Sequence, residues 1–117
     1  MPHAVLDKQV DLQEYQKKFE PIIKKNDRLI KIENIFVEKH NRNALLSTVV
    51  IDEEKQNFFI ELLSNAEKTT VRLFPGTDPI KTKGVKKALG SVTQNLLDLY
   101  PDSKITKTNI EEFIESD

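Results

Sequence analysis

The sequence contains no cysteine and no tryptophan, and only three of its 117 residues are glycine. The absence of cysteine excludes disulfides, zinc–thiolate sites, iron–sulfur clusters and thiol catalysis. No stretch approaches the roughly 18 consecutive apolar residues that a membrane-spanning helix needs, so we expect no membrane association. The chain also does not open on a long apolar run with a small-residue cleavage site. We therefore expect a cytoplasmic protein.

Neither sign of charge predominates, because 18 basic residues face 19 acidic ones and the formal net charge is −1. A protein that holds nucleic acid by its positive field is ordinarily more basic, so the composition argues against a nucleic-acid partner. The two histidines, His3 and His40, lie far apart and have no paired carboxylates at ligand spacing. We therefore expect no metal site.

The length fits one domain spanning residues 1–117, since a chain of this size can form one two-layer core. Hydrophobic residues make up 38% and charged residues 32%, a balance typical of a folded globular chain. The only sharp change of composition is an acidic C-terminal tail at residues 111–117. Its apolar residues either fray with the tail or dock on a neighbouring subunit.

The beginning of the chain predicts a strand followed by an amphipathic helix. Residues 4–6 form a short apolar run, and Asp11 with Glu14 three residues later resembles a capping box. Pro21 should kink or end the helix early, because it lacks a backbone donor and clashes with the preceding turn. The apolar face at helical spacing consists of Leu12, Tyr15, Phe19, Ile22 and Ile23.

From residue 28 the apolar period becomes that of strands. Residues 29–37 alternate but slip near Asn34, which predicts a bulge. A polar turn at residues 40–43 leads into residues 44–51, a nearly continuous apolar strand of the kind that is buried on both faces.

The next segment is ambiguous, because the apolar spacing within residues 58–63 suits either a helix or a strand. A strand is favoured, since residues 64–68 then form a hairpin into a further strand at residues 69–74. Residues 52–56 are interpreted as a polar connection.

The last part of the chain predicts a long helix and a final strand. Asp78 and Pro79 stand in the order preferred at a helix start, and Pro101 ends the helix. Residues 104–110 alternate as a strand. The buried stripe of the helix is predicted to be Ile80, Val85, Ala88, Leu89, Val92, Leu96 and Leu99.

The predicted order is therefore β-α-β-β-β-β-α-β. We expect an α+β two-layer sandwich, with a mixed β-sheet and both helices on one face. The second helix has the length of a right-handed crossover between parallel neighbouring strands. The uncovered face includes the apolar strand at residues 44–51, so we expect another subunit to cover it.

Met1-Pro2-His3, followed at once by a short apolar strand and an amphipathic helix, resembles the tautomerase superfamily. The shape is most similar to its 5-carboxymethyl-2-hydroxymuconate isomerase branch. Residues 69–73, the helix over residues 79–100 and the strand from residue 104 resemble that family's second β-α-β unit. The resemblance implies a homo-oligomer, usually a trimer, with active sites between subunits.

The resemblance also implies a chemistry. Removal of Met1 would leave Pro2 with a free secondary amine, and an apolar pocket or nearby cations would lower its pKa and make it a general base. An arginine would hold the carboxylate of a small keto or enol substrate. Arg42, at the end of a strand, is the first choice for that role and Arg72 is the second. No cofactor is needed.

A separate signal is the start of the second predicted helix, where Lys81 and Lys83 stand close to backbone amides that could hold an anion. The plainer interpretation is a capped helix with solvated lysines.

The sequence thus leaves two functions open. The first is a tautomerase-like enzyme that isomerises a small carboxylate-bearing compound with Pro2 as the base. The alternative is a non-catalytic oligomerisation or interaction domain on a similar scaffold. A cavity that joins Pro2 to an arginine would favour the first.

Overall fold

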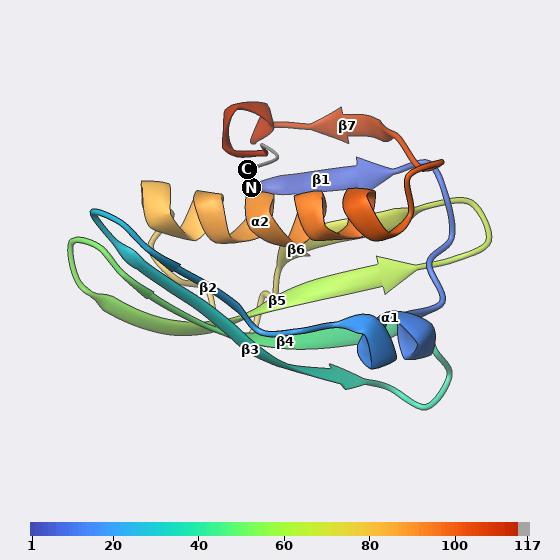
Figure 1. Cartoon of the computed structure of the whole chain (residues 1–117), viewed down its shortest axis with the longest axis horizontal. Helices are drawn as coiled ribbons and strands as arrows, with labels where there is room; N and C mark the ends of the chain where they lie inside the picture. Colours follow the sequence, from blue (N-terminus) through green and yellow to red (C-terminus); the bar gives the residue numbers. More distant parts are fainter. Residues whose placement is uncertain (115–117) are drawn as a thin grey trace.

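The computed structural model describes residues 1–114 and consists of one curled antiparallel sheet that wraps around a long helix (Figure 1). The elements in chain order are β1 (His3–Leu6), α1 (Leu12–Lys18), β2 (Ile22–Lys25), β3 (Leu29–Val37), β4 (Asn43–Ile51), β5 (Lys55–Ser64), β6 (Thr69–Leu73), α2 (Lys83–Leu99), β7 (Ile105–Thr108) and the 3-10 helix η1 (Glu111–Phe113).

The α+β class is confirmed, but the mixed sheet is wrong. The seven strands have the order β2-β3-β4-β5-β6-β1-β7, and every described hydrogen-bonded pair is antiparallel. Both β6 and β7 run antiparallel to β1, which lies between them. The helical crossover therefore connects two strands that run parallel without being neighbours, because the N-terminal strand fills the position between them.

The predicted element order also lacks one strand that the structure contains, β2. Residues 22–25 form β2, which pairs with β3, instead of continuing the first helix. Pro21 follows the end of α1 at Lys18, and the next residues alternate between half-buried and exposed. That alternation is the period of a strand, and it outweighs the helical spacing that Ile22 and Ile23 share with α1.

The central strands lie near their predicted positions, with two differences. Strand β4 is buried on its inner face only, since its residues alternate between half-buried and buried, and β5 already begins at Lys55, inside the predicted connection. The pairing of β3 with β4 shifts between Ile32 and Asn34, which confirms the bulge. The ambiguous residues 58–63 belong to β5, and a tight hairpin connects Ser64 to Thr69.

Helix α2 begins four residues later than predicted, because its cap is Thr82 and not Asp78. The Gln56 side chain holds the preceding segment outside the helix. Its Oε1 accepts from the Ile80 amide at 2.7 Å, and its Nε2 donates to the Ile80 carbonyl at 3.2 Å. Ile80 is consequently 59% exposed and does not belong to the buried stripe.

The core lies between the inner face of the sheet and the two helices. Leu12 and Tyr15 of α1 and the stripe of α2 from Val85 to Leu96 share one cluster with inner-face residues such as Ile30 and Leu46. Tyr15 also connects the helices, since its hydroxyl donates to Asn95 Oδ1 at 2.7 Å. Burial raises the pKa of Tyr15 well above its usual value.

The chain after β7 returns to α2 and packs on it. Ile110 is buried in the core, and Phe113 and Ile114 pack against it. The contact is close at Gly90, where an added Cβ would lie 1.9 Å from the Phe113 carbonyl oxygen. Residues 111–114 of the predicted acidic tail thus dock on the chain's own helix, and residues 115–117 lie outside the described part. Within residues 1–114 we find no helix with the length and apolarity required to cross a membrane.

Candidate functional site

Pro2 lines a cavity of about 280 Å³ between the start of β1, the start of α2 and the end of β7. Its ring is buried, because even-numbered residues of this strand point toward the helix side of the sheet. The cavity is also lined by Met1, Lys81, Lys86, Asn109 and Ile110.

The two lysines give the cavity a positive charge. Lys81 forms an ion pair with Asp78, with 2.5 Å between Nζ and Oδ1. Lys86 is half-buried, and its ammonium group forms no ion pair or hydrogen bond within residues 1–114. A cation removed from water without a partner is costly, so this arrangement favours an anionic ligand.

Asn109 fixes the backbone of the first three residues. Its Oδ1 accepts from the His3 amide at 2.9 Å, which turns its Nδ2 toward the Met1 carbonyl oxygen at 2.7 Å. His3 Nδ1 contacts the same oxygen at 2.9 Å. No local signal could have revealed Asn109, because its partner residues stand more than a hundred positions away.

Neither Arg42 nor Arg72, the two arginines that the resemblance suggests for carboxylate binding, lines this cavity. Arg42 is exposed in the turn before β4, three strands away from β1. Arg72 lies beside His3 in the register, but on the face of the sheet opposite Pro2. Its Nε and Nη2 lie 2.9 and 2.8 Å from Glu61 Oε1, so its partner is a carboxylate of this chain.

Of the two lysines predicted near the helix start, Lys81 and Lys83, only the first lies at the cavity. Lys81 lines the Pro2 cavity, whereas Lys83 does not and is exposed in the first turn of α2. One turn further along the helix, Lys86 takes the position in the cavity. Lys81 itself precedes α2, whose first residue is Lys83.

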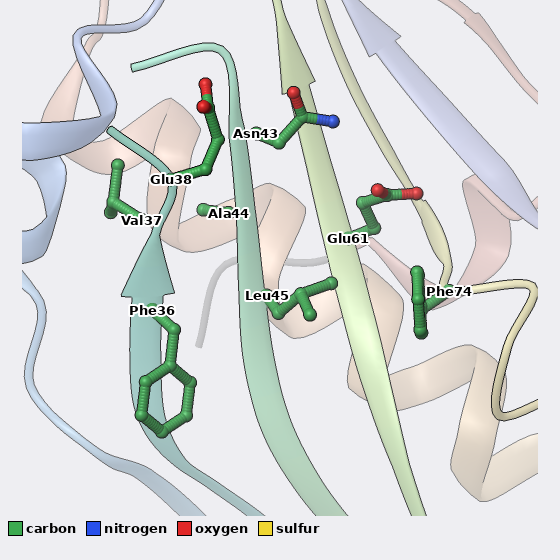
Figure 2. Close-up of a pocket in the computed structure, with 8 residues that line it drawn as sticks. All are labelled: Phe36, Val37, Glu38, Asn43, Ala44, Leu45, Glu61 and Phe74. Atoms are coloured by element: carbon green, nitrogen blue, oxygen red, sulfur yellow. The ribbon is translucent and has the colours of Figure 1, made fainter. Parts of the chain in front are cut away.

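A second hollow of about 300 Å³ lies on the outer face of the sheet, away from both helices. Phe36, Leu45 and Phe74 form its apolar wall, and Glu61 and Asn43 supply polar groups (Figure 2). In the strand register Phe36 faces Leu45, and Leu45 faces Glu61. Phe36 is 56% exposed, so this face is apolar and open to solvent.

No cluster of three or more histidine, aspartate or glutamate side chains within residues 1–114 has the arrangement of a metal site. Comparison of the chain with protein-family models, with curated proteins and with solved structures finds no match.

Proposed function

We propose that the form of this chain that begins at Pro2 is a keto–enol tautomerase for a small carboxylate-bearing compound. The observation that carries the proposal is that Pro2, Lys81 and Lys86 line one cavity. The base and the carboxylate-binding group that this chemistry needs are then neighbours.

The environment suits a proline amine that acts as a base. Without Met1, the Pro2 nitrogen becomes a secondary amine at the wall of a cavity with two ammonium groups. Like charges and partial burial both disfavour the protonated amine, so its pKa falls below the roughly 7.7–8.0 of an ordinary α-amino group. Such an amine can take a proton from the carbon beside a carbonyl near neutral pH.

The resemblance implies that an arginine holds the substrate carboxylate. In this cavity we assign that role to the lysines. Lys86 has no carboxylate partner within residues 1–114, and Lys81 shares its charge with Asp78. Lys86 is therefore the stronger candidate. The reaction moves one proton between carbon and the Pro2 nitrogen while the electron pair shifts between the C–H bond and the carbonyl oxygen.

The test is ketonisation of phenylenolpyruvate and 2-hydroxymuconate by chains whose first residue is confirmed by mass. We expect a rate above buffer for the chain that begins at Pro2 and roughly a hundredfold loss when Met1 is retained, because the nitrogen is then an amide. Lys86→Ala should raise KM, whereas Lys83→Ala, on the same helix but outside the cavity, should not. No rate above buffer with Met1 absent would refute the proposal.

A second candidate function, a non-catalytic interaction domain, is supported by the outer face. Three large apolar side chains on that face are substantially exposed, Phe36 at 56%, Ile23 at 54% and Ile51 at 39%. Leu45, Val49 and Phe59 continue this apolar surface on β4 and β5, half-buried on the same side. We propose that a second copy of the chain covers this face, as in the homo-oligomer, a trimer, that the resemblance implies.

If the outer face mediates self-association, a charged side chain introduced there should weaken the oligomer. Phe36→Lys should shift the sedimentation coefficient to that of a monomer, because the lysine would have to be desolvated in the contact. Ile80→Lys is the matched control, since Ile80 is 59% exposed but lies in the loop before α2. A wild-type chain that sediments as a monomer at tens of micromolar would contradict this proposal.

A further inference from the structure

The outer face of the sheet has two chemically different ends, because the strand register arranges its outward-pointing residues in rows. The row at the hollow crosses β3 to β6 and consists of Phe36, Leu45, Glu61 and Arg72. Two rows at the other end cross β2 to β5 and carry lysines, the nearer about 14 Å further along β4. These lysine rows consist of Ile23, Lys31, Val49 and Asn57, and of Lys25, Leu29, Ile51 and Lys55.

The lysines of these rows have no partner of opposite charge. Lys25 and Lys55 are exposed and Lys31 is half-buried, and none of their ammonium groups forms an ion pair or a hydrogen bond within residues 1–114. Glu33, the extra residue of the bulge, stands between the two ends, and the acidic residues 52–54 belong to the turn beyond β4. The outward-pointing strand positions of this end therefore carry only positive charge.

The hollow at the opposite end carries negative charge. Its charged lining residues are both carboxylates, Glu38 and Glu61 (Figure 2). Hydrogen bonds from the backbone amides of His40 at 2.9 Å and Arg42 at 2.8 Å lower the pKa of Glu38, so this carboxylate stays ionised. Glu61 shares its charge with Arg72, so Glu38 is the stronger attractor of a cation. An apolar wall with carboxylates suits the hydrocarbon stem and ammonium group of a lysine.

We infer that the second copy covers the outer face by a two-fold axis that crosses the strands, so that Lys31 of each copy enters the hollow of the other. This inference rests on the proposal that a second copy covers this face, and it adds the orientation of that copy and the residue that it contributes. In a two-fold contact each pair of facing residues occurs twice. The assembly is then a dimer, in contrast to the trimer that the resemblance implies.

Charge decides between the two directions that a two-fold axis in this face can take. An axis along the strands would lay the lysine rows of one copy on those of the other, and like charges that face each other oppose association. An axis across the strands reverses their direction. It therefore brings the lysine rows of each copy over the hollow of the other, where the carboxylates lie.

The strand register also gives the facing residues. Lys31 lies opposite Val49, two residues after Ser47 on β4. Phe36 lies opposite Leu45, two residues before Ser47. An axis at Ser47 therefore places Lys31 of one copy against Phe36 of the other, at the edge of the hollow.

Two charge variants, measured alone and mixed, test this orientation. Phe36→Lys should be monomeric because the introduced lysine faces Lys31, and Lys31→Glu should be monomeric because the introduced carboxylate faces Glu38. In an equimolar mixture the introduced carboxylate of one variant faces the introduced lysine of the other, and the second contact is the native one. We expect sedimentation velocity to show dimers in the mixture alone, with a dissociation constant at least roughly tenfold below that of either variant.

Lys83→Glu is the matched control, because Lys83 is exposed on α2, away from the outer face. This variant should associate like wild type, and mixing it with Phe36→Lys should not bring the latter into dimers. Far-ultraviolet circular dichroism of each variant confirms that loss of association is not loss of folding.

The outcomes distinguish failure of this orientation from failure of the contact itself. A monomeric wild-type chain would contradict self-association, and the orientation with it. Association of the wild-type chain, together with a mixture of the two variants that stays monomeric, would overturn the two-fold register and leave the outer face as the contact. A trimeric wild-type particle would overturn it in the same way.

Discussion

Replacing Arg72 with methionine is expected to lower the free energy of unfolding by about 3 kcal/mol, more than removal of its partner would. The side chain of Glu61 is only 9% exposed, whereas that of Arg72 is 34% exposed. Both guanidinium contacts, at 2.9 and 2.8 Å, go to the same carboxylate oxygen. Without them a carboxylate would remain buried in the middle of the sheet without its ion-pair partner.

Glu61→Gln is the matched comparison and should cost about 1 kcal/mol, because the more exposed guanidinium can turn to water. The double variant Glu61→Leu, Arg72→Leu should unfold near the wild-type midpoint, since a pair of apolar side chains often replaces a buried ion pair without loss. The chain has no tryptophan, so urea unfolding is followed by far-ultraviolet circular dichroism.

The same variant separates stability from chemistry. Arg72 was a candidate for binding the substrate carboxylate on sequence grounds, but it lies on the face of the sheet opposite Pro2. Arg72→Met should therefore leave ketonisation by the folded protein unchanged. A stability within 0.5 kcal/mol of wild type, which is roughly the effect of an ordinary surface substitution, would contradict the role assigned to the ion pair.

Local features of the fold were predictable because they depend on nearby residues. The bulge near Asn34, the hairpin at residues 64–68 and the strand at residues 69–74 all rest on alternation and turn chemistry within a few positions. The start of α2 was not predictable, since Gln56 holds Ile80 from a distant strand. Asp78 and Pro79 have the sequence of a helix start, but tertiary hydrogen bonds outweigh that local preference.

The pairing of strands was the main failure, and its cause is topological. The position of β1 between β6 and β7 depends on contacts between residues that stand far apart in the sequence, such as His3 with Arg72 and Ala4 with Thr108. Neither periodicity nor capping carries that information. For the same reason the sequence pointed to Pro2 and Lys81 as separate candidates. It could not show that both line one cavity, or that Asn109 lines it too.

Gly90→Ala is expected to lower the free energy of unfolding by about 2 kcal/mol, although alanine favours a helix by about 1 kcal/mol over glycine. The added Cβ would lie 1.9 Å from the Phe113 carbonyl oxygen and 2.5 Å from its carbon. These are backbone atoms, so no side chain can rotate to make room. The segment from Ile110 to Phe113 must move away from α2, and the buried Ile110 would lose part of its packing.

Gly76→Ala provides the control, because its added Cβ would meet only the ring of Phe74, the far end of a side chain that can turn. Urea unfolding should separate the two variants, and hydrogen exchange should show faster exchange at residues 110–113 in Gly90→Ala alone. Equal stability of Gly90→Ala and wild type would show that the segment is not held against the helix.

The Gly90 contact also connects the C-terminal segment to the candidate site. Asn109 and Ile110 both line the Pro2 cavity, and they directly precede η1, the element that the larger residue would displace. Gly90→Ala should therefore lower kcat/KM for ketonisation by the chain that begins at Pro2, even under conditions where the protein remains folded. If unfolding becomes easier while kcat/KM is unchanged, Asn109 keeps its position independently of the helix contact, and the hydrogen bond from Thr108 to His3 is sufficient to hold it.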